Sequence, residues 1–129
     1  MTVAIAFSLV APVGARQRPY DAIMKDVGST FGTLRKTLET GDLTATTSDA
    51  EKLARLFTEV EQFWVPFRTK DAIDAARGAR DAAVAMAGAA KAKDAQAAKT
   101  AATRLAASCT ACHLSHREQL PDKTYRIKP

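Results

Sequence analysis

Aromatic residues are scarce in this chain: one Trp, two Tyr and five Phe make up 6% of 129 residues. β-Branched strand formers are few and scattered, whereas alanine is abundant, especially after residue 70. This composition disfavours a sheet and favours an all-α fold, and the length allows one domain with one core. Such a core is weak, because each buried methyl group contributes only about 0.8 kcal/mol. A large apolar cofactor would add the buried apolar surface that an alanine-rich core lacks.

The chain also lacks the features of a nucleic-acid-binding protein and of a hydrolytic enzyme. Its net charge is +5 with a pI near 9.5, but the positive charges form no cluster and no aromatic residues alternate with them, as a base-stacking surface would require. A solvated cationic surface explains the charge better. No carboxylate pair stands out, nor any nucleophile beside a base. We therefore expect neither nucleic-acid binding nor an enzyme.

Residues 1–15 carry no charge and form a short apolar run that ends in Val-Gly-Ala. Small residues at such an end are typical of a signal-peptidase site, so these residues are predicted to be a signal peptide, with the mature chain beginning near Arg16. A retained anchor and ordinary N-terminal structure are the alternatives. The run is shorter than the roughly 20 residues of a membrane span, and no membrane segment is expected in the mature form.

Apolar residues recur at steps of three and four over four segments, which predicts four helices in a single domain over residues 16–129. The expected helices are 19–41, 48–66, 71–92 and 94–116. The start of the second helix is placed at Ser48 because Ser48 and Glu51 form a capping-box pattern. The alternative is an earlier start at Asp42. Short connections and sustained heptad-like spacing favour an antiparallel up-and-down four-helix bundle.

The only two cysteines lie in one motif at the end of the fourth predicted helix, Cys109-Thr-Ala-Cys112-His113. This spacing is typical of c-type haem attachment, in which two thioethers hold the porphyrin and the imidazole ligates the iron. On a helix the three side chains share one face. The rival interpretations are weaker: structural zinc needs four ligands, a redox dithiol would sit in a βαβ unit, and a disulfide here would close a very short loop. One covalent haem c is the predicted cofactor.

A sixth iron ligand, if the protein supplies one, must come from upstream of the motif. Only 16 residues follow His113, and none of them is methionine. His116 is one turn further along the same helix and hence on the same side of the haem. After removal of the signal peptide, Met24 and Met86 remain as methionine candidates, both on predicted core stripes.

These features resemble the class II cytochromes c, the group of cytochrome c′ and the low-spin cytochrome c556. The resemblance covers residues 18–120 and rests on three places. The first is the haem motif at 109–113, followed by Arg117 where the family often has a basic residue. The second is Ile-Met-Lys-Asp-Val-Gly at 23–28, and the third is Phe-Trp-Val-Pro-Phe at 63–67.

The resemblance implies two alternatives for the iron. In c556-type proteins a methionine of the first helix completes a six-coordinate centre, and the matching residue here is Met24, opposite His113. In cytochromes c′ an apolar side chain guards a five-coordinate iron that binds NO or CO; Met24 would then merely pack, and the haem-facing residue would lie near Tyr20. The resemblance also implies that Arg117 lies near the proximal haem face or a propionate and that Arg18 pairs with a propionate. The alternatives are that Arg117 interacts only with the dipole of the helix C-terminus and that Arg18 is a solvated residue ahead of the first helix.

The sequence therefore predicts a periplasmic monohaem cytochrome that carries single electrons, with Cys109 and Cys112 holding the haem and His113 and Met24 ligating iron. The alternative is a gas-binding cytochrome c′. The positive charge favours redox partners with acidic surfaces. The resemblance is compatible with a monomer or a homodimer.

Overall fold

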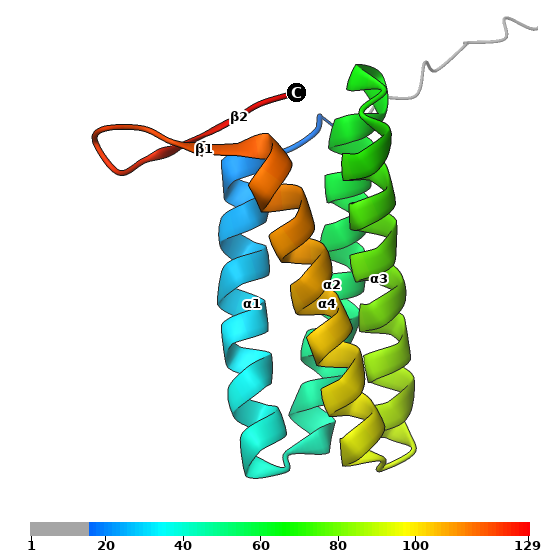
Figure 1. The fold of residues 1–129 in the computed structure, drawn as a ribbon. Helices are drawn as coiled ribbons and strands as arrows, with labels where there is room; N and C mark the ends of the chain where they lie inside the picture. Colours follow the sequence, from blue (N-terminus) through cyan, green and yellow to red (C-terminus); the bar gives the residue numbers. More distant parts are fainter. Residues whose placement is uncertain (1–15) are drawn as a thin grey trace, which may run out of the picture.

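The computed structural model describes residues 16–129, and the predicted signal peptide at 1–15 lies outside the described residues. Four helices run alternately up and down the molecule (Figure 1), so the predicted antiparallel four-helix bundle is confirmed. The elements, in chain order, are α1 (Tyr20–Thr40), α2 (Leu43–Trp64), the short 3₁₀ helix η1 (Val65–Phe67), α3 (Lys70–Lys91), α4 (Ala95–His116), β1 (Arg117–Gln119) and β2 (Tyr125–Ile127). Among residues 16–129, no helix combines the length and the apolar character needed to cross a bilayer.

Side-chain caps set the start of two helices. Asp42 and Asp94 each accept a hydrogen bond from the backbone N–H three residues further on, at 3.0 Å and 2.9 Å, which satisfies one of the free donors of the first turn. The earlier of the two predicted starts for the second helix is thus confirmed, and the capping box at Ser48 is wrong. Gly41 ends α1 with φ at +77°, a left-handed conformation that glycine adopts without steric cost.

The core is unevenly shared among the helices. Helices α1 and α2 contribute the larger apolar side chains, whereas α3 contributes Met86 and seven alanines. Helix α4 buries only Ala98, Ala101 and Leu105, all in its first half. Each helix packs closely against the next one in sequence, but α1 and α4 barely touch. The second half of α4, which carries the cysteine motif, therefore faces space that no protein core fills.

The C-terminal segment, which was expected to lie along the surface, also has regular structure. Residues 117–127 form an antiparallel hairpin in which Arg117 pairs with Ile127, and its residues are exposed or half-buried. Asp122 stabilises the turn by accepting hydrogen bonds from the backbone N–H and hydroxyl of Thr124 at 2.9 Å and 2.6 Å. Ile127 packs against the core cluster. This C-terminal hairpin extends from the end of α4, beside the start of α1 (Figure 1).

Candidate cofactor site

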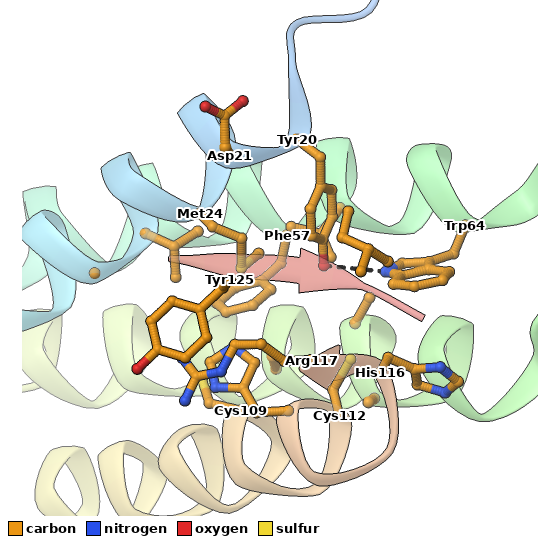
Figure 2. Close-up of a pocket in the computed structure, with 18 of the residues that line it drawn as sticks. Tyr20, Asp21, Met24, Phe57, Trp64, Cys109, Cys112, His116, Arg117 and Tyr125 are labelled. Carbon is orange, nitrogen blue, oxygen red and sulfur yellow. Dashed lines mark hydrogen bonds between the residues drawn. The ribbon is translucent and has the colours of Figure 1, made fainter. Parts of the chain in front are cut away.

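A cavity of about 940 Å³ occupies the space between α1 and α4. Its volume falls within the range of roughly 300–1,000 Å³ that is usual for ligand and cofactor sites. All four helices and the C-terminal hairpin contribute to its wall, which is mainly apolar. Figure 2 shows Met24 and Tyr20 extending from α1 toward the helix that carries Cys109 and Cys112. The predicted site residues of α1 and α4 thus meet across one cavity.

Cys109 and Cys112 lie on the cavity wall, one helical turn apart on α4. Both are free thiols and half-buried. Burial raises the pKa of the Cys109 thiol and raises that of Cys112 from 9.0 to about 11, with the Asp71 carboxylate adding to the second shift. Both groups are therefore neutral thiols at neutral pH in the cofactor-free chain, side by side and facing the cavity.

His113 lies on the same wall and is half-buried. Burial is the main cause that lowers its pKa, and the positive charge of Arg117 adds to it. A lowered pKa favours the neutral imidazole, which is the form that binds a metal ion. The surroundings of His113 therefore suit a ligand role.

The two methionine candidates have different surroundings. Met24 lines the cavity from α1 and is half-buried, whereas Met86 is fully buried in the core and does not line the cavity. Tyr20, the other haem-facing candidate, lines the same wall as Met24, one turn earlier. The structure thus brings Met24 and Tyr20 to the cavity and separates Met86 from it.

An aromatic and polar cluster of Tyr20, Trp64 and His116 lines one part of the cavity. The indole Nε1 of Trp64 donates a hydrogen bond to the hydroxyl oxygen of Tyr20 at 3.1 Å, and burial raises the pKa of Tyr20 to about 12. The Trp64 and His116 rings lie with their centroids 5.1 Å apart. Nε2 of His116 is 2.8 Å from an Asp71 carboxylate oxygen, a contact that lowers the pKa of Asp71. His116 on the cavity wall is thus held by Trp64 and Asp71.

The two predicted arginines have different positions. Arg18 does not line the cavity; its guanidinium pairs with Asp26 at 2.8 Å and with Glu59 at 2.9 Å, and these carboxylates raise its pKa. Arg117 does line the cavity, and its backbone is extended at the start of β1 rather than helical. Of the two residues expected near propionates, the structure therefore brings only Arg117 to the cavity.

Two further cations on the cavity wall were missed from the sequence. Lys25 adjoins Met24 on α1, and Arg126 comes from β2. The signal for Arg126 is short: Tyr-Arg-Ile at 125–127 alternates polar and apolar residues after a Pro-Asp turn, a pattern typical of a hairpin strand. Lys25 carries no comparable signal, because a lysine on a helix surface is usually only solvated.

Comparison of the chain with protein-family models, with curated proteins and with solved structures finds no match. Within residues 16–129, no three His, Cys, Asp or Glu side chains are grouped as they would be to hold a metal ion.

Gly28 offers a test of whether the cavity is the site of a cofactor. A Cβ atom added at Gly28 or at Gly32 would meet no atom within 4 Å, and of these two glycines Gly28 lines the cavity. Leucine at either position should stabilise the haem-free chain by up to about 1 kcal/mol, because glycine is a poor helix residue. In the haem-loaded chain, Gly28→Leu should instead cost about 1–3 kcal/mol through overpacking, while Gly32→Leu stays stabilising. Urea unfolding of the haem-free and haem-loaded chains measures these stability changes. If haem binding changed the stability of Gly28→Leu and of Gly32→Leu by the same amount, the cavity would not be the haem site.

Because burial raises the pKa of both cysteine thiols, we expect the haem-free chain to lose stability at alkaline pH. Unfolding returns the pKa of Cys112 from about 11 to 9.0, so the folded state binds more protons between these values and stability must fall as pH rises through them. We expect the urea midpoint to decline above about pH 9 and to decline less in a Cys109→Ala/Cys112→Ala variant. Identical pH profiles for the two chains would show that thiol burial does not contribute.

Proposed function

We propose that this chain is a monohaem c-type cytochrome that carries single electrons, related to the class II cytochromes c. The observation that carries the proposal is the cavity between α1 and α4, which Cys109, Cys112 and His113 line from α4 and Met24 lines from α1. The thiols would bind the porphyrin through thioethers, and His113 and Met24 would be the axial ligands. The bound haem would supply a reversible one-electron Fe(III)/Fe(II) couple.

The residues around the cavity support this role in three ways. Apolar side chains of α2 and α3, among them Phe57, Val60 and Ala76, form its floor and would limit access of water to the iron. The half-buried His113 favours the neutral imidazole needed for ligation. Arg117, at the cavity wall, is the predicted partner of a propionate.

The location and the partners follow from the same proposal. Because c-type haem is attached on the periplasmic side in bacteria, the proposal includes export through the predicted signal peptide at 1–15. The net charge of +5 would accelerate encounters with redox partners whose surfaces are acidic.

A gas-binding cytochrome c′-like protein is the second candidate. The observation that favours it is the open space at Gly28, one turn beyond Met24 on the cavity wall, where a Cβ would meet no atom within 4 Å. If Met24 leaves the iron five-coordinate, that space would admit a small ligand such as NO or CO.

Expression with a c-type maturation system tests both candidates. Haem that stays with the wild-type chain after denaturation, and is absent from a Cys109→Ala/Cys112→Ala variant, is the expected result. Oxidised and reduced absorption spectra then separate the candidates. Low-spin bands and little response to CO favour electron transfer, whereas a high-spin spectrum that changes with CO favours gas binding. Absence of covalent haem from the wild-type chain would refute both.

A further inference from the structure

The charged residues on the cavity wall are distributed unequally. The contributions of α2 and α3, namely Phe57, Val60, Trp64, Ala75, Ala76 and Ala79, carry no charge. Charged and titratable groups come instead from α1, α4 and the C-terminal hairpin: Tyr20, Asp21 and Lys25; Cys109, Cys112, His113 and His116; and Arg117, Tyr125 and Arg126. Three of these are basic side chains (Lys25, Arg117 and Arg126) and one is a carboxylate (Asp21). Such a cavity suits a mainly apolar ligand that carries anionic groups at one edge.

The hairpin holds two of the three cations in defined positions. The guanidinium carbon of Arg117 lies 4.2 Å from the centre of the Tyr125 ring, within the range of a cation–π contact. Arg126 faces Glu118 across the two strands and contacts its carboxylate through Nε at 2.9 Å and through Nη2 at 2.8 Å. A guanidinium carries five N–H donors, and within residues 16–129 the Nη1 group of Arg126 has no hydrogen-bond partner, so it can donate to a ligand.

The hairpin is also fastened to the bundle. The backbone N–H of Lys128 donates to the His116 carbonyl at 2.8 Å, and the Lys128 carbonyl lies 2.7 Å from Nδ1 of His116. Asp71 contacts the other ring nitrogen of His116, and Ile127 packs on the core. These contacts tie the strand that carries Arg126 to α4 and α3, and the pair with Glu118 holds its guanidinium beside β1.

We propose that the C-terminal hairpin is part of the cofactor site and that Arg126, together with Arg117, binds the carboxylate edge of the haem. This inference rests on the proposed function. Haem is an apolar macrocycle with two carboxylates on one side, which matches a cavity with uncharged walls and cations on one flank. Guanidinium groups suit carboxylates because they donate parallel hydrogen bonds. Arg126 of the hairpin would therefore bind the propionate that the sequence analysis assigned to Arg18. The guanidinium of Arg18 is instead paired with Asp26 and Glu59.

Haem and its dimethyl ester provide a direct test, because the ester keeps the macrocycle and removes both negative charges. The full-length Cys109→Ala/Cys112→Ala chain is used so that binding is reversible and an equilibrium constant can be measured by absorbance titration. In this background Arg126→Gln should weaken haem binding about tenfold, as expected for loss of a charge-assisted hydrogen bond, and leave binding of the ester unchanged. Lys123→Gln is the matched control, since it removes one positive charge from the turn of the same hairpin without touching the cavity.

The outcomes separate this inference from the proposed function. Equal effects of Arg126→Gln and Lys123→Gln on haem affinity would mean that only net charge matters, and would overturn the inference. An equal loss for haem and for the ester would overturn it as well, because the effect would then be structural. Failure of the double-alanine chain to bind haem would also count against it. Failure of the proposed function is seen separately, as absence of covalent haem on the wild-type chain.

Discussion

Replacing Met24 by alanine is expected to convert a low-spin haem spectrum into a high-spin one. Met24 lines the cavity from α1 and His113 lines it from α4, and alanine lacks the thioether sulfur that would complete the coordination. Loss of the sixth ligand weakens the ligand field of the iron and removes a ligand that raises the reduction potential. Absorption spectra of the oxidised protein, together with a CO titration of the reduced protein, measure the change. We expect CO to bind readily to the variant and poorly to the wild type.

Met86→Ala is the matched control for that experiment. Met86 is fully buried and does not line the cavity, so its truncation should cost about 2–5 kcal/mol of stability and leave the spectrum unchanged. A wild-type protein that is already high-spin would contradict ligation by Met24 and favour the gas-binding alternative. An unchanged low-spin spectrum in Met24→Ala would assign the sixth ligand to another group.

The second large effect is expected for Trp64→Ala, which should lower the free energy of unfolding by about 3–5 kcal/mol. Trp64 is 1% exposed. Its indole contacts the rings of Tyr20, Phe63, Phe67 and His116. Its removal creates a void and also removes the donor to the Tyr20 hydroxyl. Urea unfolding of the haem-loaded protein, followed by circular dichroism, measures the loss.

Two variants separate packing from hydrogen bonding at this position. Trp64→Phe keeps most of the apolar contact, so its free energy of unfolding should fall by less than that of Trp64→Ala. About 1 kcal/mol of that fall would come from the lost hydrogen bond to Tyr20. Phe67→Ala removes a ring from the same cluster that is 50% exposed, and its cost should be clearly below that of Trp64→Ala. Equal losses for Trp64→Ala and Phe67→Ala would show that Trp64 does not anchor the end of the bundle.

The helices were predictable from the sequence because their signals are local and repeated. Apolar spacing predicted the number and order of the four helices, and Asp94 marked the start of the fourth. For the second helix the capping-box pattern at Ser48 competed with the cap that the structure shows at Asp42. The part of the site on α4 was predictable in the same way, because the spacing of Cys109, Cys112 and His113 alone puts them on one helix face. That they face Met24 across a cavity depends on which helices diverge, and sequence spacing carries no such information.

The remaining differences arise from long-range contacts. The exposed Arg18 pairs with Glu59, which is 41 positions away in sequence, and with Asp26, which is 8 positions away. The residues next to Arg18 in sequence therefore do not predict these ion pairs. The hairpin was missed because its strands are three residues each, too short for a periodic signal, and because its stability depends on docking of Ile127 and on the contacts of His116. Arg126 was missed together with the hairpin that carries it, whereas Lys25 was missed because a lysine on a helix surface is usually only solvated.

The near absence of contact between α1 and α4 also has a consequence for how the chain folds. The extensive helix contacts are all between helices that follow one another in sequence, so the bundle has a low contact order, which favours rapid folding. The one interface that would join the first helix to the last, and that would carry the largest loop-closure cost, is replaced by the cavity. The cofactor would then close that loop, and the polypeptide need not do so alone.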